Sequence, residues 1–242
     1  MLPCLAFFFG CFTLRAATSG DFEYTDNGTS ITITKYRGTG GAVIIPSSID
    51  SKPVTTIGDY AFSFRTGLTN VTILNGVTAI GANAFYGCYK LTSVIIPSGV
   101  TAIGAGAFNS CFGLTSVTLP SGVTSIGAHA FSSCFKLTSV TIPSSVTSIG
   151  AGAFSACTGL TSVTILGSVT SIGDTAFVSC TKLTRILFVG NAPTSFGRRV
   201  FGSEPSCEIN YYENAAGFTS PTWKGQRTHK LSLSNDHAPA AE

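Results

Sequence analysis

The chain has 242 residues, of which 44% are hydrophobic and 10% are charged, and its formal net charge is +3. This hydrophobic fraction allows a buried core, whereas disordered chains are poor in apolar residues. The small net charge and the lack of a dense basic segment exclude a typical nucleic-acid-binding surface, so no nucleic-acid partner is expected.

Residues 1–17 predict a secretory signal peptide. The apolar run over residues 5–14 has the length of a signal h-region, and Ala16 and Ala17 provide small residues for cleavage. The run is shorter than the roughly 20 apolar residues of a membrane-spanning helix, so no transmembrane segment is expected. Two features are unusual for a signal peptide: no Lys or Arg precedes the apolar run, and Arg15 lies close to the expected cleavage site. Cys11 leaves a lipoprotein signal as the alternative.

Residues 18–50 predict an N-terminal β cap. The segment Thr29–Thr34 alternates polar and apolar side chains, as a strand does, and a turn signal, Asp-Asn-Gly, precedes it. Residues 41–46 match the strand end of the later repeats. The terminal unit of a solenoid has to cover an exposed apolar end, so an atypical first unit is expected.

Residues 51–188 contain six 23-residue units in phase, in which the columns of Ile, Gly, Phe and Leu are unbroken. The segment Leu114–Leu119 places apolar side chains on one face of an extended piece. A second extended piece is expected at Val123–Ile126. A helical or 3-10 turn is expected at Ala128–Cys134, with Phe131 pointing inward. Each unit then completes one coil, and the coils have to stack in order to bury their apolar side chains.

The repeat resembles the BspA-type bacterial leucine-rich repeat. The resemblance rests on Leu-x-x-Val-x-Ile followed by Pro-Ser-x-Val-Thr-x-Ile-Gly-x-x-Ala-Phe-x-x-Cys, and residues 44–58 resemble the usual entry of that family. It extends over residues 21–212. The resemblance implies a repeat solenoid with a parallel β-sheet on one face and short helical or 3-10 turns opposite. It further implies a secreted or cell-surface protein of adhesion and protein binding, with no shared catalytic residues to transfer.

Residues 189–231 predict a degenerate repeat followed by a C-terminal cap. The segment Thr194–Phe201 repeats the pattern one residue out of phase, and Ser206–Tyr212 predicts a last strand. Residues 213–226, which include Trp223, are expected to fold over the open end of the core. Residues 232–242 are polar and rich in Ala and Pro, and predict a flexible tail.

A cysteine column runs through five of the six units. Its members are Cys88, Cys111, Cys134, Cys157 and Cys180, and Cys207 follows in the cap. A metal or redox site favours CxxC spacing or Cys/His clusters, so no metal site is predicted. Six cysteines in an oxidising compartment allow three disulfides. Parallel side chains disfavour disulfide geometry, and a buried thiol ladder is the simpler interpretation.

No catalytic site is predicted. The three histidines, His129, His229 and His237, are scattered along the chain, and no acid, base and nucleophile recur together. Residues 77–188 contain no Glu and a single Asp, at position 174, which excludes paired-carboxylate chemistry in the array. We therefore expect a chain that is not an enzyme and that binds no cofactor.

A grid of hydroxyl side chains on the sheet face is the first candidate ligand-binding surface. Its central row includes Thr118, Thr141 and Thr164. A regular hydroxyl grid can form hydrogen bonds with a flat or repetitive ligand. The alternative is that Thr is simply well suited to an exposed strand position.

A column of aromatic residues just before the strands is the second candidate surface. Three successive units place aromatic residues there, namely Tyr89, Phe112 and Phe135. The next column alternates Gly with Lys, so that lysines recur about 10 Å apart, as the strand spacing requires. These are Lys90, Lys136 and Lys182. Exposed aromatics mark binding surfaces, and the lysines favour an anionic polymer or a glycan. The alternative is local packing against Tyr86, with lysines kept for solubility.

The sequence therefore predicts a secreted or cell-surface repeat module that binds a protein or a glycan. The alternative is a structural spacer or a self-associating scaffold with no ligand of its own. The sequence identifies neither the ligand nor the oligomeric state.

Overall fold

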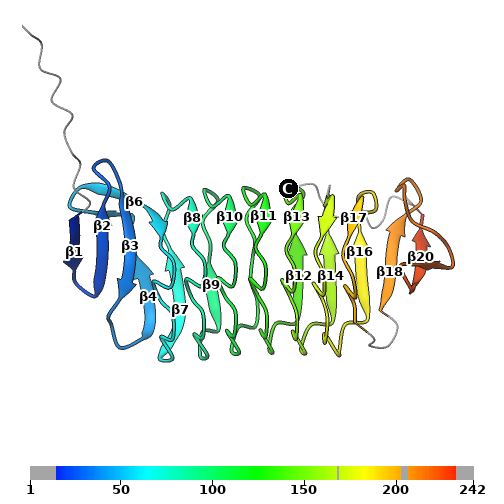
Figure 1. Cartoon of the computed structure of the whole chain (residues 1–242), viewed down its shortest axis with the longest axis horizontal. Coiled ribbons are helices and arrows are strands. Elements are labelled where there is room, and N and C mark those ends of the chain that lie inside the picture. Colours follow the sequence, from blue (N-terminus) through cyan, green and yellow to red (C-terminus); the bar gives the residue numbers. More distant parts are fainter. Residues whose placement is uncertain (1–14, 168, 203–206, 233–242) are drawn as a thin grey trace, which may run out of the picture.

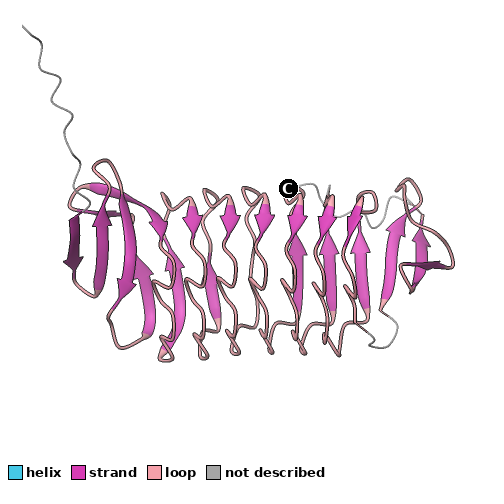
Figure 2. Cartoon of the chain, in the orientation of Figure 1, coloured by secondary structure: helices cyan, strands magenta, loops and turns pink. Residues whose placement is uncertain are grey.

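The chain forms an elongated solenoid, in which each 23-residue unit makes one coil and the coils stack side by side (Figure 1). The computed structural model describes residues 15–167, 169–202 and 207–232. Residues 1–14 of the predicted signal peptide and residues 233–242 of the predicted tail lie outside these ranges. The described residues form strands and turns and contain no helix (Figure 2).

One long sheet extends along the solenoid. Its strands, in spatial order, are β1 (Arg15–Ser19), β2 (Phe22–Asp26), β3 (Ile31–Tyr36), β6 (Lys52–Ile57), β8 (Ala79–Ile80), β10 (Ala102–Ile103), β11 (Ser125–Ile126), β13 (Ser148–Ile149), β15 (Ser171–Ile172) and β17 (Ser195–Phe196), and β5 (Ser48–Ile49) pairs with β6. The pairs β1–β2 and β2–β3 are antiparallel, and the strands from β3 to β17 are parallel. The end of the predicted signal segment, residues 15–17, therefore belongs to β1.

A second face of the solenoid carries two shorter sheets. Their strands are β4 (Gly41–Ile45), β7 (Leu68–Ile73) and β9 (Ser93–Ile95) in one, and β12 (Ser139–Ile142), β14 (Ser162–Ile165), β16 (Arg185–Phe188), β18 (Glu208–Tyr212), β20 (Gln226–Leu231) and β19 (Thr222–Trp223) in the other. Successive parallel strands pair position for position, as in Val140↔Val163 and Thr141↔Thr164. The 23-residue period thus becomes a constant register between coils.

Between β9 and β12, the extended segment predicted at Leu114–Leu119 is not assigned as a strand. Its alternation is as predicted, because Leu114, Val117 and Leu119 are buried and Thr118 is exposed. The ladder is looser here, since the Thr138 amide donates to the Thr115 carbonyl at 3.4 Å, beyond the usual range of about 2.7–3.2 Å. The predicted alternation of this extended segment is therefore confirmed, although regular strand pairing is missing in this coil.

The remaining side of each coil consists of consecutive turns, at the place where a helical or 3-10 turn is predicted for Ala128–Cys134. Half of the amides bond within the coil, as the Ala130 amide does to the Gly127 carbonyl at 3.2 Å. The amides between them bond to the next coil, as the Phe131 amide does to the Ala153 carbonyl at 2.8 Å. Two residues of this turn have positive φ, namely His129 (φ 56°) and Ser133 (φ 60°). A backbone that alternates in this way cannot continue a helix.

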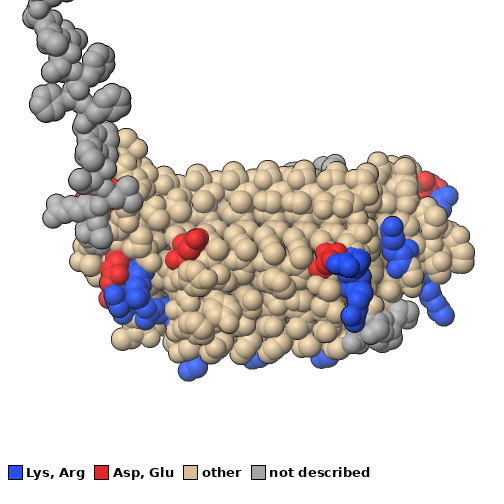
Figure 3. All heavy atoms as spheres, viewed as in Figure 1, with Lys and Arg blue, Asp and Glu red and all other residues tan. Residues whose placement is uncertain are grey.

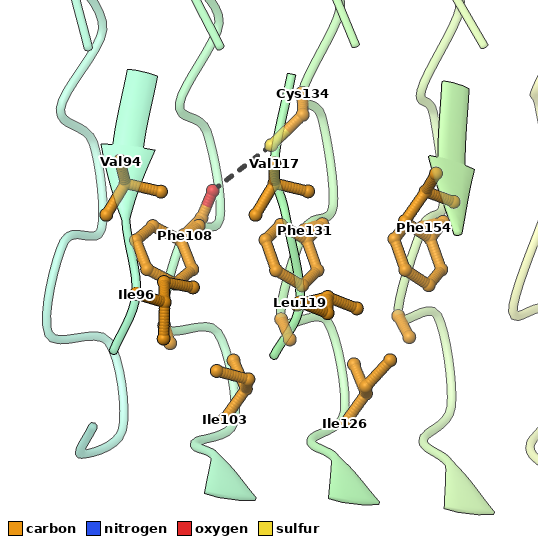
Figure 4. Close-up of a cluster of buried hydrophobic side chains, with 14 of the residues drawn as sticks. Val94, Ile96, Ile103, Phe108, Val117, Leu119, Ile126, Phe131, Cys134 and Phe154 are labelled. Carbon is orange, nitrogen blue, oxygen red and sulfur yellow. Dashed lines mark hydrogen bonds between the residues drawn. The ribbon is translucent and has the colours of Figure 1, made fainter. Parts of the chain in front are cut away.

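Phenylalanine side chains form a ladder along the axis of the core (Figure 4). The ring centroids of Phe108 and Phe131 lie 5.3 Å apart, as do those of Phe131 and Phe154, and both pairs are within 7° of parallel. The side chains are completely buried, and Val, Ile and Leu from the two sheet faces surround them. We call the column Phe62, Phe85, Phe108, Phe131, Phe154 and Phe177 the core ladder.

The antiparallel strands β1–β3 close the N-terminal end of the core. The Tyr36 ring is 4% exposed and stacks 5.1 Å from Phe62, the first member of the core ladder. Phe22 packs on Tyr36 at 5.4 Å. The apolar end of the first coil is thereby shielded from water.

The C-terminal end is closed by aromatic side chains around Trp223, which is 5% exposed. Its ring lies 4.9 Å from that of Phe196 and 5.0 Å from that of Phe218. The one-residue phase shift predicted from the sequence appears in the pairing of Ser171 with Ser195. The prediction that Ser206–Tyr212 is the last strand is wrong, because β20 pairs in parallel with β18 beyond it. The boundaries of the caps and the repeat array stay predictions.

Candidate ligand-binding surface

The three aromatic residues predicted to lie side by side are stacked on the surface of the solenoid. The ring centroids are 4.8 Å apart for Tyr89 and Phe112, and 4.7 Å apart for Phe112 and Phe135. The outer two side chains are exposed, at 39% for Tyr89 and 42% for Phe135, and Phe112 between them is half-buried. We call these three residues the aromatic strip.

The local backbone directs each strip residue outward. The Tyr89 amide donates to the Gly87 carbonyl at 2.9 Å, and the Leu91 amide donates to the Cys88 carbonyl at 3.0 Å. Both Cys88 and Leu91 are completely buried. Because the buried cysteine and leucine anchor the turn on either side, the aromatic residue between them has to face the solvent.

The rings of the aromatic strip stack on one another, so most of their faces are covered. Their planes differ by 11° for the first pair and 14° for the second, so they stack face to face. Only the outer faces of Tyr89 and Phe135 remain available for stacking. A ligand that lies along the strip therefore meets mainly ring edges, which carry the positive end of the aromatic quadrupole.

The Gly/Lys alternation beside the strip has a packing cause. A Cβ atom at Gly159 would lie 2.4 Å from the Phe135 carbonyl oxygen, and one at Gly113 would lie 3.0 Å from the Tyr89 carbonyl oxygen. Close approach to the preceding coil thus excludes a large side chain from alternate coils. The lysines stand in the other coils and are all exposed, at Lys90, Lys136 and Lys182.

Acidic residues are absent from the sequence between Asp59 and Asp174. The ion pairs among the described residues involve other cations, namely Arg37, Lys52 and Arg198. In Figure 3, charged side chains gather toward the two ends of the displayed face and leave its middle largely uncharged, apart from cations at the lower edge. The lysines next to the aromatic strip are therefore unopposed by nearby carboxylates in the array.

The hydroxyl grid on the sheet face extends over fewer coils than the repeat array has. Thr118 and Thr141 are exposed, Thr164 is half-buried, and Thr141 pairs directly with Thr164. On one side the row is interrupted by Ile95, which is 61% exposed. The structure thus brings three hydroxyl residues into neighbouring coils and places an apolar side chain next to them.

Two further threonine ladders were not predicted from the sequence. The Thr124 hydroxyl donates to the Thr101 carbonyl at 3.1 Å, and the Thr161 hydroxyl donates to the Thr138 carbonyl at 3.0 Å. Similar bonds recur along both columns, 23 residues apart within the array and 24 residues apart between Thr194 and Thr170, after the phase shift. The signal was present as Thr at fixed positions in every unit. These hydroxyls form hydrogen bonds between neighbouring coils, so their role is structural.

The six described cysteines are buried free thiols without disulfides, and the five of the column form a ladder. The Cys134 thiol donates to the Phe108 carbonyl at 3.3 Å (Figure 4), and the thiols of the other four coils bond in the same way. Burial raises the pKa of Cys88 to about 12, and it raises the pKa of Cys134 well above its usual value. Thiols that stay protonated are poor nucleophiles and poor metal ligands.

The remaining titratable groups do not form a reactive cluster. Among the described residues, no group of three or more His, Cys, Asp or Glu side chains could hold a metal ion. His129 lies in a turn, His229 is exposed on β20, and His237 lies outside the described residues. The pKa of Asp174 is lowered by the backbone amide and the side chain of Arg198. In the part of the chain that the structure describes, no helix could span a membrane.

Comparison with known proteins connects this geometry to one family. The chain matches the BspA type leucine rich repeat region, in six copies, over residues 43–160 and 101–226. A leucine-rich repeat protein from T. pallidum has a similar crystal structure, with 36% sequence identity, a TM-score of 0.69, and alignment over 76% of this chain and 86% of that one. A leucine-rich repeat protein from Bacteroides ovatus shows the same fold, with 22% identity, a TM-score of 0.60, and coverage of 90% and 66%. No curated protein matches the chain.

Leucine-rich repeat scaffolds are generally non-enzymatic, and they generally bind proteins. The period, the stacked coils and the cysteine column agree with this assignment. The matched segments together extend over residues 43–226, which is most of the chain. The protein therefore belongs to the BspA-type leucine-rich repeat family.

Proposed function

We propose that this protein is a non-catalytic binding module, secreted or displayed at the cell surface, which holds a protein or glycan ligand on the aromatic strip and the neighbouring lysines. One observation carries the proposal: three stacked aromatic side chains are kept on the surface of a solenoid whose core does not need them. Exposed apolar surface of this kind marks interaction sites.

The fold tolerates a small polar residue at the strip position. Thr66 and Thr158 occupy it in other coils, and their amides donate to Phe64 and Ala156 at 2.9 Å, as the Tyr89 amide does to Gly87. The same turn therefore forms with or without an aromatic side chain. Because folding does not require the three rings, we attribute them to contact with a ligand.

The proposal extends to the location of the protein. The predicted signal peptide at residues 1–17 supports export, and so does the surface location that the resemblance to the BspA-type repeat implies. N-terminal sequencing of the protein recovered from its native host tests the prediction. We expect a mature N-terminus close to residue 18, and recovery of an intact residue 1 would contradict export by this route.

Removal of the aromatic strip tests the proposed function. The variant Tyr89→Ala/Phe112→Ala/Phe135→Ala is compared with the wild type on protein and glycan arrays. The control is Tyr60→Ala/Phe64→Ala, which removes two aromatic side chains that are 59% and 56% exposed on the turn side. We expect the strip variant to lose its array signals and the control to keep them. Equal signals from all three proteins would refute the strip as the binding site.

A second candidate function, a self-associating scaffold, is favoured by strand β4. It lies at the edge of its sheet and its sequence, Gly-Ala-Val-Ile-Ile, carries no charge. Uncharged edge strands tend to pair with other chains. At the other end, the short strand β19 pairs with β20 over Gln226 and Arg227, and β20 carries the charged residues Arg227 and Lys230, which oppose further pairing. Light scattering at increasing concentration separates the candidates: a monomer throughout supports the binding module, and concentration-dependent growth supports the scaffold.

A further inference from the structure

We propose that the aromatic strip and its lysines bind an acidic, proline-rich polypeptide segment in the polyproline II conformation. The inference rests on the proposed function and adds the chemistry of the ligand. Three observations carry it: the sign of the charge, the orientation of the rings and the spacing of the coils.

The charge of the surface favours an anionic ligand. Lys90 and Lys136 border the strip, Lys182 continues their column, and the sequence has no acidic residue from 60 to 173. The outward ring edges add partial positive charge of the same sign. Carboxylate groups are complementary to both, so a ligand rich in Asp or Glu is favoured over a neutral one.

The orientation of the rings favours a polypeptide over a carbohydrate. Sugars pack their apolar faces on the open faces of aromatic rings, but here most ring faces are covered by the neighbouring ring at 4.7–4.8 Å. Ring edges form a narrow apolar ridge instead. Proline rings are compact and apolar, and proline-rich segments dock on aromatic surfaces without a large loss of conformational entropy.

The spacing of the coils selects the conformation of the ligand. One coil advances the rings by 4.7–4.8 Å, so lysines in every second coil recur about 9.5 Å apart. A polyproline II helix rises about 3.1 Å per residue with three residues per turn, so equivalent side chains recur about every 9.3 Å. An acidic residue at every third position therefore meets one lysine per turn.

Other regular conformations fit less well. Equivalent side chains on one face of a β-strand recur about every 6.7 Å. On an α-helix, the same face returns after seven residues, about 10.5 Å along the axis. Over the two intervals between Lys90 and Lys182, the mismatch for polyproline II is about 0.4 Å, which a flexible lysine side chain absorbs.

Synthetic peptides test the inference on the full chain. The probe is a peptide of five Glu-Pro-Pro repeats, with fluorescence anisotropy measured at low and at physiological ionic strength. Two matched peptides are a version with all Glu residues gathered at one end and a version with Gln in place of Glu. We expect the repeating acidic peptide to bind most tightly, with weaker binding at higher salt because screening weakens exposed charge pairs.

Lysine variants provide the matched protein controls. The variant Lys90→Gln/Lys136→Gln/Lys182→Gln is expected to bind the repeating peptide about tenfold more weakly, as the loss of three exposed ion pairs implies. The control Arg185→Gln/Arg227→Gln/Lys230→Gln removes three exposed charges on β16 and β20 and is expected to retain affinity. An equal loss in both variants would mean that only net charge matters, which overturns the inference.

The outcomes separate this inference from the proposed function. Equal binding of the repeating and the gathered peptides overturns the polyproline II register. Lysine-dependent binding of a polyuronate without binding of the peptide overturns the choice of polypeptide. In both cases a strip-dependent array signal leaves the proposed function standing. Only unchanged array binding after removal of the aromatic strip refutes the proposed function itself.

Discussion

Two columns of stacked aromatic rings run along this solenoid, one inside and one outside. The core ladder has ring centroids 5.1–5.4 Å apart between Phe85 and Phe177, and the aromatic strip has centroids 4.7–4.8 Å apart. Nearly equal distances arise in both because the coil spacing fixes them. The two columns differ in burial and in regularity, since every coil of the array contributes to the core ladder and only three contribute to the strip.

The comparison of the two columns distinguishes structural positions from functional positions in a repeat protein. A position that faces the core must be filled in each coil, because a missing ring would leave a cavity between its neighbours. A position that faces water has no such requirement, and Thr66 replaces the aromatic residue without a change in the turn. Side chains that vary between coils are therefore the ones that a ligand can select.

The largest expected effect on stability comes from removing a ring of the core ladder, and it is compared with removing a ring of the aromatic strip. Phe131→Ala leaves a cavity between Phe108 and Phe154 and should lower the free energy of unfolding by about 3–5 kcal/mol. Phe135→Ala removes a ring of similar size from the surface and should cost about 0.5 kcal/mol. Urea unfolding followed by circular dichroism measures both. Similar losses in the two variants would contradict the division between core ladder and strip.

A smaller effect is expected from a glycine beside the strip. In Gly159→Ala the new Cβ atom approaches the Phe135 carbonyl oxygen to 2.4 Å, and the coils have to shift, at a cost of about 1–3 kcal/mol. Lys136→Ala, in the neighbouring coil, should change stability by no more than about 0.5 kcal/mol. Thermal unfolding compares them. If Gly159→Ala is as stable as the wild type, packing does not explain the Gly/Lys alternation.

The thiol ladder should make the interior sensitive to alkaline pH. Burial, followed by the neighbouring Cys111, raises the pKa of Cys134 above its ordinary value of 9.0. The folded chain therefore keeps the proton that the unfolded chain releases, so the stabilising contribution is complete below pH 9.0 and is lost as the pH rises above it. Each such thiol contributes about 1.4 kcal/mol per pH unit to this loss.

Comparison of the wild type with Cys134→Ala isolates one thiol. The variant should show a shallower decline of unfolding free energy between about pH 9 and pH 10.5, although it is less stable at neutral pH because it lacks the sulfur. Urea titrations at several pH values provide the slopes. Parallel slopes would show that the thiol ionises equally in the folded and unfolded chains. Thiol-labelling of the native wild type at neutral pH should be slow for the same reason.

The smallest effect is expected from the exposed threonine ladders. Thr124→Val keeps the shape of the side chain and removes its hydrogen bond to the Thr101 carbonyl, which should cost about 0.5 kcal/mol. The control is Thr118→Val on the sheet face, where the hydroxyl side chain is exposed to solvent. Differential scanning calorimetry of both variants tests the structural role of the ladder. A larger loss of stability in Thr118→Val than in Thr124→Val would contradict a structural role for the threonine ladder.

Much of the fold was predictable because the side-chain pattern repeats. The inward Phe131, Leu137 and Cys134 follow from their columns, and each is completely buried. The one-residue phase shift after the array was also visible, and the structure shows it in the pairing of Ser171 with Ser195. Whether a side chain points into the core depends on the local alternation of apolar and polar residues, which can be seen directly in the sequence.

At Ala128–Cys134, where a helical or 3-10 turn was predicted, single i→i+3 hydrogen bonds form without a continuous helix, because every second amide bonds to the next coil. The Phe131 amide bonds to Ala153, 22 residues away in sequence, and the left-handed residue His129 allows that exchange. The irregular strand in the coil of Leu114 also depends on other coils, because the lengths of its hydrogen bonds are set by the neighbouring coils. The secondary-structure propensity of a segment predicts neither these hydrogen bonds nor those of the turn.

The period, the family, the core columns and the candidate surface residues could all be predicted from the sequence. Only the packing of the coils shows that the rings of the aromatic strip cover one another's faces and that close contacts require glycine between the lysines. Both facts concern atoms one coil apart, separated by 23 residues in the chain and by one strand spacing in space. The sequence records which side chains recur, but only stacking of the coils fixes which of their surfaces remain open to a ligand.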